Sequence, residues 1–170
     1  NRLDLAKPVI AKVNSVAVGG GFETVLAYDL VIAADHARFG FPEPKVNLAA
    51  IGGGGLHRLA RQIPLKQAMN LLLTGRIFLA EEALALGLVN QVVAPENLTA
   101  ATNNLIASIL SGAPLAVRAT KQAAMDGLNL SLAEAMAIRH PTIETMKASA
   151  DATEGPLAFA EKRAPAWGGT

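Results

Sequence analysis

Three consecutive glycines at positions 19–21 constrain the fold of this chain more than any other feature. They follow residues 8–14, a β-branched segment typical of a buried strand, and precede residues 22–27, which favour a short helix. A second strand is expected at 30–34. Because glycine tolerates tight turns and close backbone approach, the sequence predicts a compact strand–turn–helix–strand unit here.

The remaining pattern changes character along the chain. Up to residue 96, short helices and extended segments alternate, with an irregular stretch after residue 44. After the strand at 30–34 we expect an extended segment over 37–41, helices over 56–62, 65–73 and 81–86, and a strand over 88–93. From residue 97 the pattern is wholly helical, over 97–112, 114–127, a long helix opened by a capping box at Ser131 and kinked at Pro141, and about 156–163. We therefore expect an α/β portion over 1–96 and a helical region over 97–170.

Composition excludes several classes of protein. The 170 residues are 51% hydrophobic and 17% charged, which argues against disorder and allows a real core. With 15 basic and 14 acidic residues the net charge is +1, so neither nucleic acid nor an anionic membrane is expected as the main partner. The chain has no cysteine, so it carries no disulfide, thiolate nucleophile or thiolate metal site.

The sequence shows no membrane or export signal. No apolar run approaches the roughly 20 residues of a membrane helix, and the first residues lack the apolar core of a signal peptide. A cytoplasmic protein is expected, with the mitochondrial matrix as an open alternative. The chain does not start with Met and begins as though cut from something longer.

Two glutamates occupy unusual positions. Glu23 directly follows an apolar, glycine-rich segment, where a charge is costly unless it has a partner or a function. The alternative is a first-turn carboxylate favoured by the helix dipole. Glu43 lies between Pro42 and Pro44, which restrict the backbone and hold the carboxylate in place. Taken alone, it could equally be an ordinary acid of a surface loop.

The glycine runs suggest contacts to negatively charged oxygens. Backbone N–H groups at a helix N-terminus carry partial positive charge, so the triplet at 19–21 suits an oxyanion, or it forms only a tight turn. A second run at 52–55 could cradle a phosphate or a carbonyl, or could form a flexible loop. The three histidines are scattered without metal-ligand spacing, so no metal site is expected.

An ordered set of short motifs runs along nearly the whole chain. The motifs are K-P-V-I-A-K-V-N at 7–14, G-G-G-x-E at 19–23, D-L-V-I-A-A at 29–34, F-G-x-P-E at 39–43, G-G-x-x-R-L at 54–59, L-T-G-R at 73–76, E-E-A at 81–83, G-L-V-N at 87–90, and E-G-P-L-A-F-A-E-K-R at 154–163 followed by P-x-W. This set resembles the enoyl-CoA hydratase/isomerase (crotonase) family. The tail at 154–167 resembles the carnitinyl-CoA dehydratase branch of this family.

The resemblance implies a crotonase-type ββα spiral core that lacks its N-terminal part, and a helical C-terminal region that assembles homotrimers or hexamers. It implies an enoyl-CoA hydratase in which Glu23 activates water, Glu43 protonates Cα and the Gly20 N–H binds the thioester oxygen. Gly19 and Gly52 are expected at the substrate. No metal and no cofactor are expected, because coenzyme A is part of the substrate.

Two residues of the tail are candidates for binding coenzyme A. Phe159 and Lys162 are three residues apart, so on a helix they share one face. An aromatic ring and a cation suit adenine stacking and a phosphate contact, and the resemblance places the C-terminal helix near a neighbouring subunit's coenzyme A. The alternative is a core phenylalanine beside cations favoured by the helix dipole.

Other functions stay open at this point. The same family includes enoyl-CoA isomerases and carnitinyl-CoA dehydratases, and a catalytically incompetent fragment or interaction subunit is a further alternative. By this resemblance, the hydratases that use two glutamates have one after the glycine triplet and one in the Pro-Glu element. This chain has a glutamate at both positions, Glu23 and Glu43. This pair is the reason to favour hydration.

Overall fold

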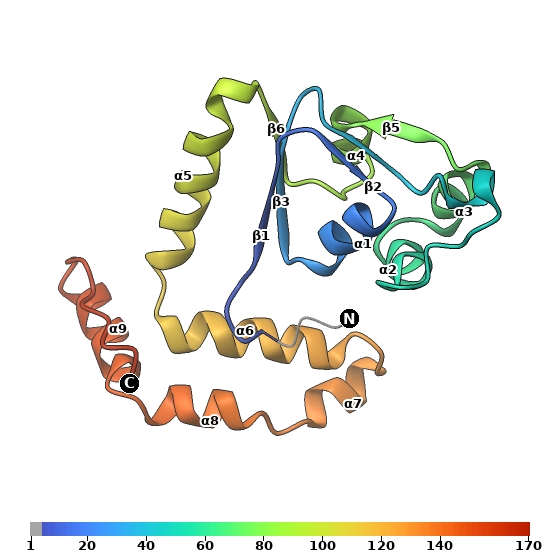
Figure 1. Cartoon of the computed structure of the whole chain (residues 1–170). Helices are drawn as coiled ribbons and strands as arrows, with labels where there is room; N and C mark the ends of the chain where they lie inside the picture. The colour runs from blue at the N-terminus through green and yellow to red at the C-terminus, as the bar shows by residue number, and fades with distance from the viewer. Residues whose placement is uncertain (1–4) are drawn as a thin grey trace. The chain divides into compact units, whose positions relative to one another are not determined.

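The computed structural model describes residues 5–170, which form two compact units (Figure 1). One unit contains Val9–Asn104, and the other contains Leu5–Pro8 with Leu105–Thr170. The first unit holds the described strands, and the second is built from helices. Helix α5 (Leu98–Leu110) contributes residues to both units.

The first unit contains two three-stranded sheets. Strands β1 (Ile10–Val13), β3 (Leu30–Ala34) and β6 (Gln91–Val93) form a parallel sheet in the order β1-β3-β6. The other sheet has the order β2-β4-β5, in which β4 (Arg38–Gly40) pairs parallel to β2 (Val16–Val18) and antiparallel to β5 (Ile77–Leu79). Consecutive strands alternate between the two sheets: β1 and β3 belong to the first, and β2 and β4 to the second. A helix connects β2 to β3.

Short helices complete this unit. Helix α1 (Gly20–Ala27) is the connection between β2 and β3. The others are a 3₁₀ helix η1 (Glu43–Val46), α2 (Gly55–Gln62), α3 (Leu65–Thr74), α4 (Ala80–Ala85) and a 3₁₀ helix η2 (Pro95–Asn97). The predicted strands at the start of the chain and the helices α1 to α4 are confirmed to within a few residues.

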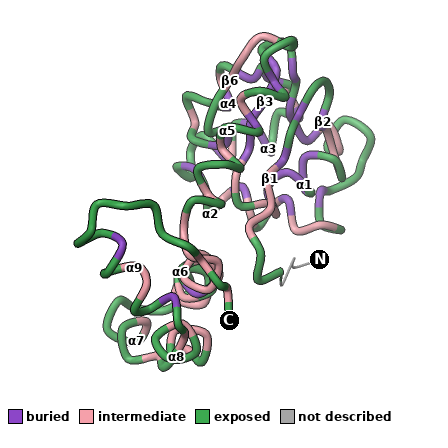
Figure 2. Tube along the Cα trace, turned by 90° about the vertical axis from the view of Figure 1, so that its left-hand side faces the viewer, coloured by how far each residue is buried: buried purple, intermediate pink, exposed green. Residues whose placement is uncertain are grey.

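Four phenylalanines form the centre of the core. The ring of Phe22 lies 5.5 Å from Phe39, 4.8 Å from Phe41 and 5.8 Å from Phe78, measured between ring centroids. All four are buried, and buried residues are concentrated in this unit, whereas most of the helical unit is exposed (Figure 2). Tilted and edge-on ring pairs add about 0.5–1.5 kcal/mol each beyond the burial of their area.

Three local expectations for this unit were incomplete. Strands β2 and β5 have only three residues each and no alternating pattern of their own, and pairing with β4 makes them strands. The predicted strand over 88–93 is shorter, because Leu88 and Val89 are buried outside the ladder. The stretch after Pro44, expected to be irregular, starts inside the 3₁₀ helix η1, which continues to Val46.

The second unit contains α6 (Pro114–Gly127), α7 (Leu132–Ala137), α8 (Pro141–Ala148) and α9 (Asp151–Ala160). The capping box at Ser131 is confirmed, with Glu134 as its partner. One long kinked helix was predicted after it, and this is wrong. His140 is extended, as a residue before proline prefers, so Pro141 starts a new helix instead of bending an old one.

The C-terminal tail is held against α9 by two carboxylates. Buried Asp151 accepts hydrogen bonds from the N–H groups of Gly168, at 2.7 Å, and Gly169, at 2.9 Å. Arg163 donates two bonds to Glu154, and Ala166 N–H donates a third. These donors, Arg163 first, lower the pKa of Glu154 to about 2.

Among the described residues, no single helix is both long and apolar enough to cross a membrane. Two helical segments, Pro95–Leu110 and Pro114–Gly127, reach that length and composition only when they are taken together across a sharp bend.

The tail contact predicts a stability effect that can be followed by fluorescence. Asp151→Ala should lower the free energy of unfolding by about 1–3 kcal/mol, because two N–H groups lose a charged acceptor. The single tryptophan, Trp167, lies in the tail and donates to the Ser111 carbonyl, so its emission should shift to longer wavelength when the tail is released. Asp35→Ala, at an exposed aspartate, is the control and should cost less than about 1 kcal/mol. Equal losses of unfolding free energy for the two substitutions would show that Asp151 does not hold the tail.

Candidate active site

The glycine triplet forms the turn into α1. Gly19 precedes the helix with φ 55° and ψ −130°, a conformation that side-chain-bearing residues avoid. Its N–H donates to the Gly40 carbonyl at 3.0 Å, and its carbonyl accepts from the Glu23 N–H at 2.9 Å. Gly20 is the first residue of α1, so its N–H belongs to the helix end where partial positive charge collects. The turn thus places the Gly20 N–H and Glu23 in the same first turn of α1.

Glu23 is buried, with 7% of its surface exposed, and its carboxylate is held by the start of another helix. The Gly55 N–H, at the first position of α2, donates to Glu23 Oε1 at 2.8 Å. This N–H is one of the donors that a helix cannot satisfy internally, and it sits at the positive end of the dipole. Both effects stabilise a carboxylate at this position.

The second glycine run packs on Glu23. A Cβ added to Gly53 would lie 2.7 Å from the Glu23 Cβ, and one added to Gly55 would lie 2.9 Å from the Glu23 Cγ. A Cβ on Gly52 would lie 3.9 Å from Glu23 Oε2. The backbone therefore lies in direct contact with this side chain, so the run is ordered against Glu23 and is not a loose loop.

Glu43 reaches the same turn from the other side. It begins η1, and its Oε1 lies only 2.8 Å from the point that a Cβ on Gly19 would occupy. Its other oxygen, Oε2, is buried, and no hydrogen-bonding partner for it exists within residues 5–170. A buried acceptor without a partner costs free energy, so this oxygen is suited to receive a ligand or to hold a proton.

Five of the seven residues predicted from the sequence are therefore gathered around one helix start. Glu23, Glu43 and Gly19 are linked by the contacts above, Gly20 begins the helix, and Gly52 approaches the free oxygen of Glu23. Gly53 and Gly55, which contact Glu23 most closely, were expected only as part of a phosphate or carbonyl cradle. Their contact could not be read from the sequence, because it depends on where α2 starts in space.

The other two predicted residues belong to the helical unit. Phe159 is 87% exposed near the end of α9. The prediction that Lys162 shares its helical face is wrong, because α9 ends at Ala160 and the chain turns left-handed at Lys162, with φ 53°. The Lys162 N–H donates to the Phe159 carbonyl at 3.2 Å, so the two residues are close along the backbone.

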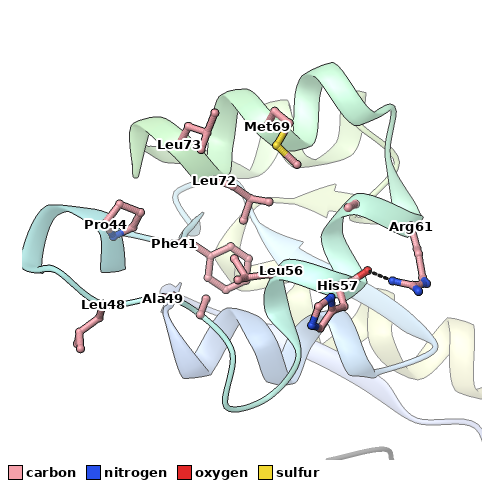
Figure 3. Close-up of a pocket in the computed structure, with 12 residues that line it drawn as sticks. Phe41, Pro44, Leu48, Ala49, Leu56, His57, Arg61, Met69, Leu72 and Leu73 are labelled. Carbon is pink, nitrogen blue, oxygen red and sulfur yellow. Dashed lines mark hydrogen bonds between the residues drawn. The ribbon is translucent and has the colours of Figure 1, made fainter.

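A separate apolar pocket of about 460 Å³ lies between η1, α2 and α3 (Figure 3). In this view Phe41 and Leu56 lie in the middle of the lining residues, and Arg61 lies at one side. Neither Glu23 nor Glu43 lines it. The two glutamates are therefore not part of its lining, although Pro44, which directly follows Glu43, is.

Comparison with known proteins finds relatives that all belong to one family of enzymes acting on coenzyme A thioesters. A family model described as enoyl-CoA hydratase/isomerase matches residues 2–170. The carnitinyl-CoA dehydratase of Salmonella arizonae is 45% identical over 170 residues, which cover 98% of this chain and 65% of that protein. The (E)-benzylidenesuccinyl-CoA hydratase of Thauera aromatica is 45% identical over 163 residues, covering 96% and 63%. The chain thus spans slightly less than two thirds of these curated relatives.

Solved structures agree with the fold. The enoyl-CoA hydratase of Bacillus anthracis superposes with a TM-score of 0.94 at 37% identity, over 98% of this chain and 64% of that one. The enoyl-CoA hydratase of Mycobacterium tuberculosis gives 0.91 at 44% identity, over 97% and 65%. These likenesses confirm the predicted crotonase-type α/β fold with a helical C-terminal region.

The packing of glycine on Glu23 predicts a local strain. Gly53→Ala should lower the free energy of unfolding by about 1–3 kcal/mol, the usual cost of overpacking, because the new methyl group meets the Glu23 side chain. Gly21→Ala, within α1 and with no atom within 4 Å of the added Cβ, is the matched control and should be neutral or stabilising. Urea denaturation of both variants measures the difference. A Gly53→Ala variant as stable as Gly21→Ala would show that the loop does not press on Glu23.

Proposed function

Because this chain belongs to the enoyl-CoA hydratase/isomerase family, we propose that the protein reversibly adds water to the double bond of a 2-enoyl-CoA thioester. The observation that carries the proposal is that the Gly19 turn contacts both glutamates: its carbonyl accepts from the Glu23 backbone N–H, and the Glu43 carboxylate packs against it. Hydration needs a base for the water and an acid for Cα, and two carboxylates beside one site can supply both.

Glu23 is the proposed base. The Gly55 N–H bonds to its Oε1 and fixes the orientation of the carboxylate, which leaves Oε2 to take a proton from water as the oxygen adds to Cβ. Glu43 is the proposed acid. Its buried Oε2, for which residues 5–170 offer no partner, is suited to carry the proton that moves to Cα. Hydration and dehydration use these steps in opposite order.

The thioester oxygen gains negative charge during both directions of the reaction. The Gly20 N–H at the start of α1 is the proposed donor, because it combines a hydrogen bond with the positive end of the helix dipole. Gly19 and Gly52 would lie beside the bound acyl group. No metal or redox cofactor is assigned. The addition of water involves no change of oxidation state that needs a redox partner, and each of the two proton transfers is assigned to a carboxylate.

Coenzyme A binding is proposed to involve a neighbouring subunit. Phe159 is almost fully exposed although it is a large apolar side chain, which suits stacking on adenine. Lys162 follows it and would contact a phosphate. In this proposal the C-terminal segment of one subunit reaches the coenzyme A of the next, in a homotrimer or a hexamer.

A second candidate is the dehydration of carnitinyl-CoA, favoured by the 45% identity to the Salmonella arizonae enzyme. It uses the same glutamate pair in the elimination direction. Assay of the full-length protein on crotonyl-CoA, carnitinyl-CoA and benzylidenesuccinyl-CoA would separate the candidates. A product with a shifted double bond, or no turnover of any thioester, would contradict both.

The acid/base pair predicts a defined kinetic result. Glu23→Gln and Glu43→Gln should each lower kcat by about 10²-fold or more, the usual contribution of general acid–base catalysis, with little change in KM. Glu81→Gln, at an exposed glutamate of α4, is the control and should leave both constants unchanged. Large effects on KM alone would point to a role in binding and would contradict the assignment.

Assembly is predicted from the exposed apolar residues of the helical unit. Leu128, Leu132 and Met136 are 69%, 76% and 78% exposed around α7, and such clusters mark interaction surfaces. The purified protein should therefore behave as a trimer or a dimer of trimers in light scattering, and Leu132→Glu with Met136→Glu should weaken the assembly. A stable, soluble monomer of the unmodified protein at micromolar concentration would contradict this prediction.

The proposed phosphate contact predicts a salt-dependent effect. Lys162→Ala should weaken acyl-CoA binding at low ionic strength, and the difference from the unmodified protein should shrink as salt is added. Lys147→Ala on α8 removes an exposed lysine of the same charge and serves as the control. Calorimetric titration with an acyl-CoA measures both. Unchanged affinity of a folded, trimeric Lys162→Ala protein would remove Lys162 from the site.

A further inference from the structure

The side chain of Arg58 folds back over the start of its own helix. Arg58 lies in the first turns of α2, and its Nε–H donates to the Gly53 carbonyl at 3.2 Å in a partly buried position. Its backbone N–H donates to the Gly54 carbonyl at 2.8 Å. The backbone bond is the ordinary first hydrogen bond of the helix, so it is the Arg58 side chain that ties α2 to the loop leading into it.

That loop is in contact with the proposed base. Gly53 and Gly55 pack against the side chain of Glu23, and the Gly55 N–H holds Glu23 Oε1 at 2.8 Å. A loop of glycines has high conformational freedom and no side chains of its own to hold it. Its position must come from restraints such as the Arg58 bond and the backbone bond from Leu56 N–H to the Ala50 carbonyl, at 3.1 Å.

We infer that Arg58 is a positioning residue for Glu23, acting through the Gly53 carbonyl and the Gly55 N–H; this inference rests on the proposed function. When the Arg58 bond is lost, the loop moves and Gly55 no longer meets the carboxylate. The ionised form of Glu23 then loses a donor and its orientation, and a misplacement of about 1 Å near reacting groups can cost about 10²-fold in rate.

The geometry separates this role from a simple effect of positive charge. Glutamine carries an N–H donor at the same number of bonds from Cα as the Arg58 Nε, but it is neutral. Methionine has the same chain length and no donor. Arg58→Gln therefore keeps the bond to Gly53 without the charge, and Arg58→Met removes both.

The test compares these variants in the full-length protein. Arg58→Met should lower kcat by about 10-fold or more with little change in KM, and should move the acid limb of the kcat/KM profile to higher pH. Arg58→Gln should stay within about threefold of the unmodified enzyme, since a neutral bond keeps roughly half the strength of a charge-assisted one. Arg61→Met is the control, because the exposed Arg61 donates to the His57 carbonyl of its own helix.

Three outcomes would overturn the inference. They are an Arg58→Met enzyme with unchanged kcat and pH profile, an Arg58→Gln enzyme as impaired as Arg58→Met, and an Arg61→Met enzyme impaired as strongly. Thermal unfolding would first establish that each variant is folded.

A second readout does not depend on turnover. Amide hydrogen exchange at Gly54 and Gly55 should become faster in Arg58→Met and stay slow in Arg58→Gln, since the loop loses its restraint only in the former. If the unmodified protein turns over no thioester, the proposed function fails while this exchange result still tests the loop restraint. Identical exchange in both variants would overturn it.

Discussion

The contact between Phe22 and Phe41 is the interaction on which the site depends. Their rings lie 4.8 Å apart in the centre of the core, and both are almost completely buried. Phe22 directly precedes Glu23, and Phe41 stands two residues before Glu43. Packing one aromatic pair therefore brings together the two segments that carry these glutamates, the start of α1 and the start of η1.

Close backbone approach is the second constraint. Gly19 allows the Glu43 carboxylate to lie against the turn, and Gly53 and Gly55 allow a loop to lie against Glu23. A side chain at these positions would collide with Glu43 Oε1, with the Glu23 side chain or with the Phe41 ring. The absence of side chains also exposes N–H groups at two helix starts, α1 and α2, so the positive ends of both helices are turned toward the acidic pair.

The helical unit uses carboxylates differently. Asp151 and Glu154, in the first turn of α9, bind the N–H groups and the arginine of the C-terminal tail. Here the acids are satisfied by local donors and have a structural role. Glu43 Oε2, in contrast, has no such donor within the described part of the chain. Whether the carboxylate oxygens have hydrogen-bond donors thus separates a structural acid from a candidate functional one more clearly than the sequence around each acid does.

The sequence by itself determined the elements whose signals are local, because they need only neighbouring residues: the glycine turn into α1, strand β3, the capping box at Ser131, and the motifs that single out Glu23 and Glu43. Tertiary structure decided what depends on distant residues. Strands β2 and β5 exist because β4 pairs with them, and the Gly55 N–H meets Glu23 across 32 positions of sequence. The end of α9 before Lys162 was likewise hidden, since a favourable helical spacing does not show where the helix stops. Local sequence signals indicate where many elements form, but only packing fixes which elements meet.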